Sequence, residues 1–168
     1  ILYREFYEIG DGDGDVGDVM VGGEQISKYF TRGELDPYRE ATPEQLQNLK
    51  ELAALVLDPL RAALGAKLSV TPHGGLNGPS VDQKRIDQGR GLRASTSQHR
   101  KGKAADVRKP ASMSYDQFTN FVCNWIAGLP PALRKRIGLG IYNPADGFLH
   151  LDLGGQRGKK TRMTIQHF

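Results

Sequence analysis

Two short motifs, widely separated in the sequence, contain three potential metal ligands and constrain the fold more than any other feature. His99 and Asp106 belong to the first motif, and His150 belongs to the second. Two imidazoles and one carboxylate can bind a zinc ion and leave its fourth tetrahedral position for water, as in catalytic zinc sites. A structural zinc site favours a fourth protein ligand, usually a thiolate, and the only cysteine is Cys123. The motifs therefore predict a fold that brings His99, Asp106 and His150 together.

The first motif predicts a turn followed by a strand. Ser97 and Gly102 bracket the turn, which places His99 near the junction of a loop and a strand. The strand is expected over residues 103–108, where Asp106 lies on one face because side chains alternate along a strand. We therefore expect His99 and Asp106 to approach each other across the turn.

The second motif predicts one strand of a hairpin. A glycine-rich strand over 137–142 is followed by a turn and by a strand over 147–153. Phe148, His150 and Asp152 share one face of this second strand, and three leucines share the other. The leucine face is expected to pack on helices, so the polar face should open to a cleft that holds the metal.

The two motifs together resemble a known family. The chain reads S-x-H-x-x-G-x-A-x-D and later G-F-x-H-x-D, as in the zinc D-Ala-D-Ala peptidase family, which shares its site with the Hedgehog signalling domain. The segment 142–157 is similar to the C-terminal motif of the branch of murein endopeptidases and phage peptidases. The resemblance covers residues 25–158. The two motifs are specific together and weak apart.

The resemblance implies one Zn²⁺ ion on His99, Asp106 and His150 and a zinc-dependent peptidase that hydrolyses amide bonds of peptidoglycan stem peptides or cross-links. Such an enzyme is an endolysin or a wall-remodelling endopeptidase or carboxypeptidase. It acts at the bacterial cell wall, either as a phage lysin or virion-associated protein, or as a periplasmic or secreted hydrolase that has lost a leader. D,D cross-links, L,D bonds and the L-Ala–D-Glu bond are all open as its target.

The residue that transfers protons does not follow the family's pattern. Many relatives have an acidic residue three positions before the last histidine, or a histidine two positions before it, where this chain has Gly147 and Phe148. Asp152, which matches the H-x-D of the similar branch, and Asp146 are the remaining catalytic candidates. We favour Asp152, whose alternative role is to orient a ligand imidazole.

An arginine of the family is also missing. Relatives carry it in the turn after an early strand, where it is thought to polarise the scissile carbonyl, and Gly74 stands about there in this chain. Either another cation stabilises the oxyanion, or the reaction is slower or different. The candidates for that role are Arg85, Arg90, Arg93 and His73.

The basic charge of the chain fits an anionic partner without naming one. The net charge is +4 and the pI is near 9.2, and guanidinium groups suit the bidentate recognition of carboxylates. Aromatic residues of the kind that stack bases are not interleaved with the cations, which argues against nucleic acid. The residues expected to bind a peptidoglycan stem peptide are Ser97, Arg93, Arg100 and His73.

Helical patterns complete the expectation of an α+β fold. Thr42 and Ser114 each begin a capping box, and leucine-rich or aromatic stripes at helical spacing follow them. Pro59 is expected to kink the first helix or to end its main part. We predict two helices, over 43–63 and 114–127, that cover one side of a small antiparallel sheet. Its strands are expected over 67–71, 103–108, 137–142 and 147–153.

The domain organisation is expected to be simple. Residues 1–23 should form a flexible acidic appendage, because the alternating aspartates lack the glycine and glutamate of a calcium loop, having Val16 and Gly22 there. Residues 24–168 should form one peptidase domain.

No apolar run approaches the length of about 18 residues that a membrane span needs. The oligomeric state is left open.

Two other classes of protein fit the sequence. One is a non-catalytic cell-wall-binding or virion structural module that retains the zinc fold, since the missing turn arginine and the displaced base permit a loss of turnover. It predicts wall binding without released products. The other is a basic nucleic-acid-binding domain, which predicts salt-dependent binding that does not need the metal.

Overall fold

The computed structural model describes residues 24–155 and 164–166, so the expected appendage over 1–23 lies outside the described residues. The chain has an α+β fold with an antiparallel sheet in the order β1-β2-β4-β3-β5. All the predicted strands are present, and β5 adds an edge strand. The elements are α1 (Arg32–Leu35), α2 (Pro43–Leu52), η1 (Ala53–Leu57), α3 (Asp58–Leu64), β1 (Ser69–Val70), α4 (Pro79–Asp87), η2 (Gln98–Lys101), β2 (Ala104–Arg108), α5 (Tyr115–Ala127), α6 (Pro131–Arg134), β3 (Gly138–Ile141), η3 (Pro144–Asp146), β4 (Phe148–Asp152) and β5 (Thr164–Gln166).

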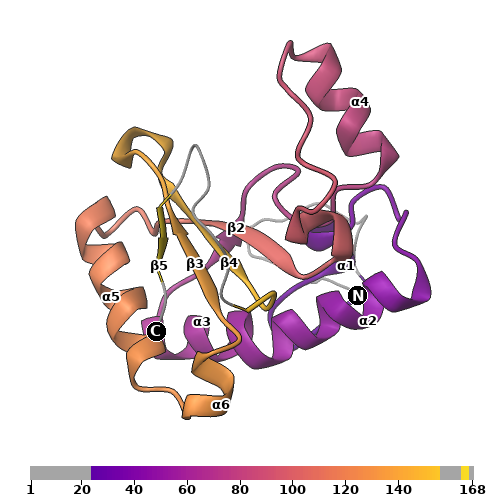
Figure 1. Cartoon of the computed structure of the whole chain (residues 1–168). Coiled ribbons are helices and arrows are strands. Elements are labelled where there is room, and N and C mark those ends of the chain that lie inside the picture. Colours follow the sequence, from indigo (N-terminus) through magenta and orange to yellow (C-terminus); the bar gives the residue numbers. More distant parts are fainter. Residues whose placement is uncertain (1–23, 156–163, 167–168) are drawn as a thin grey trace.

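The longest helix runs through α2, η1 and α3 without a break in the chain direction (Figure 1). Thr42 and Gln45 form the predicted capping box at its start. The irregularity expected at Pro59 takes the form of a π-helical segment, in which the N–H of Asp58 donates to Ala53. This wider turn carries the chain past a residue that has no N–H to donate, so the helix continues to Leu64. None of the helices in the described part of the chain combines the length and the apolar character that a membrane crossing requires.

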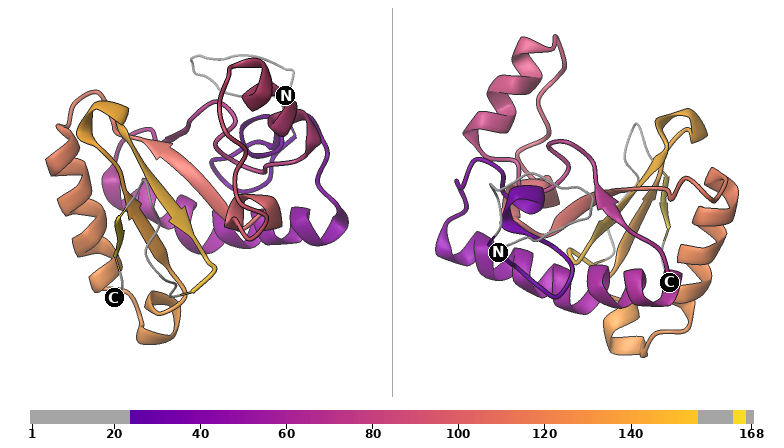
Figure 2. Two further views of the ribbon diagram at one scale, coloured as in Figure 1. Left: turned by 45° about the horizontal axis from the view of Figure 1, so that its top comes forward. Right: turned by 180° about the vertical axis from the view of Figure 1, so that it is seen from behind.

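Both long helical segments pack on the same face of the sheet, as predicted (Figures 1 and 2). Their apolar stripes and the leucines of β4 form one buried core, in which each fully buried leucine contributes about 1.5–3 kcal/mol relative to an exposed one. The opposite face of β2 and β4 carries the polar residues of the two motifs. The core residues include Leu49, Leu52, Leu57, Leu60, Val107, Phe118, Val122, Ile126, Leu139, Leu149 and Leu151.

Residues 79–96, which we call the arm, project from the rest of the molecule (Figures 1 and 2). The arm consists of α4 and the segment that leads back to η2. Its first turn is anchored, because Val81 is buried and Ser80 donates hydrogen bonds from both its backbone and its hydroxyl to Glu40. Farther along, Ile86 is exposed. The arm is therefore anchored at its base and exposed to solvent at Ile86.

Candidate metal centre

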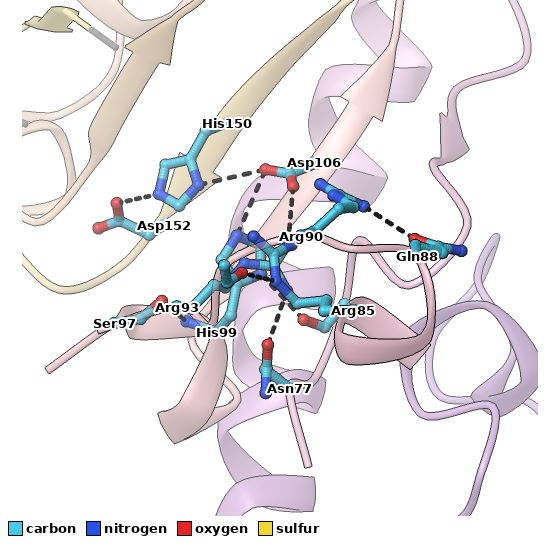
Figure 3. A network of polar contacts seen from close by, with 12 residues as sticks. Asn77, Arg85, Gln88, Arg90, Arg93, Ser97, His99, Asp106, His150 and Asp152 are labelled. Atoms are coloured by element: carbon cyan, nitrogen blue, oxygen red, sulfur yellow. Dashed lines mark hydrogen bonds and ion pairs between the residues drawn. The ribbon is translucent and has the colours of Figure 1, made fainter. Parts of the chain in front are cut away.

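The three predicted ligands converge on one point (Figure 3). One ligand atom from each of His99, Asp106 and His150 lies within 4.8 Å of the others. Asp106 Oδ1 is 3.4 Å from His99 Nε2 and 3.3 Å from His150 Nδ1. The three residues are only 3%, 4% and 3% exposed. They form a buried His–Asp–His group that could hold a metal ion.

Strand register brings Asp106 and His150 together. The two residues are direct partners in the antiparallel pair of β2 and β4. Side chains of direct partners leave the same face of the sheet, with Cβ atoms about 4.5–5.5 Å apart. The leucines on the other face exclude a shift by one residue, because such a shift would turn them out of the core. The hydrophobic pattern thus places both ligands on one face of the sheet, and the observed register makes them direct partners.

A tight turn places His99. Ser97 begins the turn and accepts a hydrogen bond from the backbone N–H of His99 at 3.3 Å. Gly102 ends it with a left-handed backbone (φ 73°), a conformation that favours glycine. A Cβ at Gly102 would also lie 2.6 Å from the carbonyl oxygen of Gln45, so the turn sits directly on α2. The predicted bracketing of the turn by Ser97 and Gly102 matches this geometry.

Each imidazole is held by an oxygen on the side away from Asp106. His99 Nδ1 lies 2.9 Å from the carbonyl oxygen of Gly75, and His150 Nε2 lies 2.7 Å from Asp152 Oδ2. A carbonyl oxygen and a carboxylate accept hydrogen bonds, so these nitrogens are the ones that donate. The other nitrogen of each ring is directed at Asp106 and can bind a metal when it is unprotonated.

The charges in the group favour an ionised carboxylate. Burial raises the pKa of Asp106, but the charges and hydrogen bonds of His99 and His150 outweigh burial and hold the pKa below its ordinary value. Burial lowers the pKa of His99. For His150, burial acts in the same direction, but hydrogen bonds with Asp106 and Asp152 raise the pKa overall. At neutral pH the Asp106 carboxylate is therefore charged and available as a ligand.

The two candidates for proton transfer lie in different surroundings. Asp152 is fully buried, and while its Oδ2 contacts His150, its Oδ1 accepts a hydrogen bond from the N–H of Gly154 at 2.8 Å. These contacts fit the alternative role that the sequence left open, the orientation of a ligand imidazole. Asp146 is exposed in η3, at the turn between β3 and β4. Proton transfer by either residue stays a prediction.

Of the three arginine candidates, Arg93 is the one that reaches the group (Figure 3). Its Nη2 lies 3.3 Å from Asp106 Oδ2, and its Nη1 donates to Asn77 Oδ1 at 2.9 Å. Burial lowers the pKa of Arg93, Asp106 opposes that shift, and the guanidinium stays charged. By contrast, Arg85 donates to the carbonyl oxygen of Gly91, and Arg90 donates to Gln88. By sequence all three arginines are candidates to stabilise the oxyanion, and of the three Arg93 alone is also expected to bind substrate.

Arg100 is engaged by the protein itself. Its guanidinium donates to both carboxylate oxygens of Asp82 and to the carbonyl oxygens of Arg93 and Ala94. These partners belong to the arm. Arg100 had been predicted to bind substrate, and the contacts that the structure gives it are those of a residue that fastens the arm.

His73 lies in the turn that also contacts the metal group. The next residue, Gly74, accepts a hydrogen bond from the backbone N–H of Asp106 at 2.8 Å. His73 has a left-handed backbone (φ 59°), which is uncommon for a residue with a side chain. Its ring stacks on Tyr38, and its Nε2 lies 2.9 Å from the hydroxyl oxygen of Tyr38. Burial lowers the pKa of His73, and the cations of the arm lower it further.

Three contributors were not found by sequence reasoning: the carbonyl oxygen of Gly75, the amide of Asn77 and the carboxylate of Asp82. A backbone carbonyl has no side-chain identity, so no motif could have revealed Gly75. Asn77 and Asp82 act on residues distant in the chain, and their spacing follows no known ligand pattern. Only the folded chain brings them to the group.

The chain matches no family model, no curated protein and no solved structure. The chemistry that the chain can support therefore depends on the buried His–Asp–His group and on the contacts that orient it.

Proposed function

We propose that the protein is a zinc-dependent peptidase that hydrolyses amide bonds in peptidoglycan stem peptides or cross-links. The observation that supports this most is the His99–Asp106–His150 group, with each imidazole oriented by a fixed acceptor. Two nitrogen donors and one carboxylate suit zinc, whereas calcium and magnesium prefer oxygen ligands. Three protein ligands leave a fourth tetrahedral position for chemistry.

Zinc, when bound, supplies Lewis-acid chemistry, because it acidifies water and polarises a carbonyl. The chain's own residues hold that chemistry in place. Gly75 and Asp152 keep the ligand nitrogens of His99 and His150 aimed at the centre. Asp106 Oδ1 faces both rings, while its Oδ2 is turned to the arm.

Arg93 is the residue to which we assign the role of the family's missing arginine. Its guanidinium lies beside Asp106 and retains donors that can bind a substrate carbonyl oxygen as negative charge develops there. To Asp152 we assign the orientation of His150. Asp146 is retained as the acid or base candidate that is not committed to a ligand.

The substrate class and the place of action come from the motif resemblance. The two motifs are similar to those of murein endopeptidases and phage peptidases, which act on peptidoglycan. The net charge of +4 supports an anionic polymer as partner. We therefore propose action at the bacterial cell wall, as a phage lysin or virion-associated protein or as a periplasmic or secreted hydrolase.

Digestion of purified peptidoglycan sacculi tests this function. Wild-type protein should release fragments, a chelator should abolish the release and added zinc should restore it. Mass spectrometry of the fragments would identify the cleaved bond. The His99→Ala variant, which lacks one ligand, should release none.

The alternative is a wall-binding or virion structural module that retains the zinc site. It predicts that protein carrying one zinc ion sediments with sacculi and releases no fragments. That outcome would overturn the enzymatic function and leave the binding module as the better account.

A further inference from the structure

One ion pair closes the base of the arm. Arg100 Nη1 and Nη2 donate to the two carboxylate oxygens of Asp82 at 2.9 and 3.0 Å. The same side chain donates to the carbonyl oxygens of Arg93 and Ala94 at 2.8 and 3.1 Å. Arg100 thus ties the first turn of α4 to the segment by which the arm returns to the sheet. Bidentate geometry makes such a pair directional as well as attractive.

A second set of contacts joins this ion pair to the metal group. Asn77 Nδ2 donates to Asp82 Oδ1 at 2.8 Å, and Asn77 Oδ1 accepts from Arg93 Nη1 at 2.9 Å. Arg93 Nη2 then lies 3.3 Å from Asp106 Oδ2. The backbone N–H of Asn77 donates to the carbonyl oxygen of His99 at 3.0 Å. Figure 3 shows the part of this network formed by Asn77, Arg93 and Asp106.

We propose that the Asp82–Arg100 ion pair is a clasp that positions the guanidinium of Arg93 at the metal group. The proposal deepens the peptidase function and rests on it for the catalytic role of Arg93. Arg93 is held at both ends, by Arg100 at its backbone carbonyl and by Asn77 at its guanidinium. Asp82 contacts both of these partners, so it links the two ends.

The clasp is separate from what holds α4 to the protein. Burial of Val81 and the hydrogen bonds of Ser80 to Glu40 anchor the first turn without Asp82 or Arg100. Loss of the clasp therefore leaves the helix attached and frees the returning segment. A displacement of the reacting groups by about 1 Å can cost about a hundredfold in rate, so a loosened Arg93 should act poorly although it is still present.

A kinetic double-mutant cycle tests the clasp in the zinc-loaded full chain, with a peptidoglycan fragment as substrate. Asp82→Asn and Arg100→Lys keep the side-chain size or charge and break the bidentate pair. Each should lower kcat by about tenfold to a hundredfold and change KM little, because the guanidinium acts in the transition state. In an Arg93→Ala background neither substitution should lower kcat any further. Two results would overturn the proposal. One is a further loss of kcat when either substitution is added to Arg93→Ala, and the other is an unchanged kcat in the single variants Asp82→Asn and Arg100→Lys.

The matched control is Arg136→Lys, which alters another arginine–carboxylate pair, 3.0 Å from Glu51 and remote from the arm. Its kcat should equal that of the wild type. Zinc content and thermal unfolding, measured for every variant, separate loss of the clasp from loss of the fold.

A readout without turnover keeps the clasp testable if the peptidase function fails. Side-chain ¹⁵N NMR of the zinc-loaded protein reports the rotation of the Arg93 guanidinium. That rotation should be restricted in the wild type and in Arg136→Lys, and free in Asp82→Asn. Equal restriction in Asp82→Asn would overturn the positioning role, whereas absence of peptide cleavage alone would overturn only the proposed function.

Discussion

Asp152 Oδ2 lies 2.7 Å from His150 Nε2, and this contact decides which nitrogen of His150 faces Asp106. The two residues are neighbours on one face of β4, because alternate residues of a strand point the same way. The carboxylate accepts a hydrogen bond from Nε2–H, so Nδ1 is left as the nitrogen that can bind a metal, 3.3 Å from Asp106 Oδ1. A metal at this site would depend on Asp152 without touching it.

Replacement of Asp152 by asparagine should weaken zinc binding by about tenfold to a hundredfold, the usual effect of removing the partner of a ligand imidazole. The asparagine amide keeps the shape of the aspartate side chain and loses the negative charge that supports His150 as a metal ligand. Competition with a chromogenic chelator measures the affinity. Asp116→Asn, which removes an exposed carboxylate in the first turn of α5, is the control and should bind zinc as the wild type does. Equal affinities for both variants would contradict the orienting role.

A methyl group at residue 138 should weaken zinc binding, as loss of the Asp152 charge should. Gly138 is the cross-strand partner of Asp152, and a Cβ there would lie 2.7 Å from Asp152 Oδ2. Because β4 is hydrogen-bonded on both sides, the carboxylate would have to leave His150. Gly138→Ala should therefore lower zinc affinity. The double variant Gly138→Ala/Asp152→Asn should bind zinc no more weakly than whichever single variant binds it less well.

Gly128→Ala is the matched control for that substitution. A Cβ at Gly128 would meet its nearest atoms at 3.7 Å, an ordinary van der Waals distance. A loss of zinc affinity in Gly128→Ala as large as in Gly138→Ala would show that the effect is not specific to Asp152.

Zinc should stabilise the folded chain. A ligand that binds only the folded state at one hundred times its Kd raises the free energy of unfolding by about 2.7 kcal/mol. Urea titrations with zinc and with chelator should show this increase in the wild type. Asp106→Ala removes the ligand that faces both imidazoles, and its stability should respond much less to zinc. An identical increase in Asp106→Ala would place the metal elsewhere.

The pH dependence of stability should contain a contribution from His73. The folded-state pKa of His73 is below its ordinary value because of burial and of the nearby cations Lys84, Arg90 and Arg93. The unfolded chain therefore binds the proton more readily, with a pKa near 6.5. This contribution to stability is fully present above that pH and is lost as the pH falls below it.

Urea unfolding between pH 5 and pH 8 measures this dependence. The wild type should lose more stability on the acid side than His73→Gln, which has no group to titrate at that position. A steeper acid loss in His73→Gln than in the wild type would reverse the sign and refute the expectation.

Sequence patterns determined most of the elements and the two motifs that carry the candidate ligands, because each of these depends on residues close in the chain. Thr42 and Ser114 form their capping boxes with residues three positions ahead. The alternation of leucines with His150 and Asp152 predicted the two faces of β4. Since the leucine face is buried, the placement of His150 and Asp106 on one face of the sheet also followed from the hydrophobic pattern, whereas their direct pairing is a feature of the fold.

Only the tertiary structure decided which of the basic residues reaches the metal group. Arg85, Arg90, Arg93 and Arg100 lie in one basic stretch, and their local sequence does not show which of them contacts Asp106. The return path of the arm brings Arg93 to Asp106, and it turns Arg100 to Asp82 instead. Such contacts join residues that a long connection separates, so they depend on how the whole chain packs and not on neighbouring side chains.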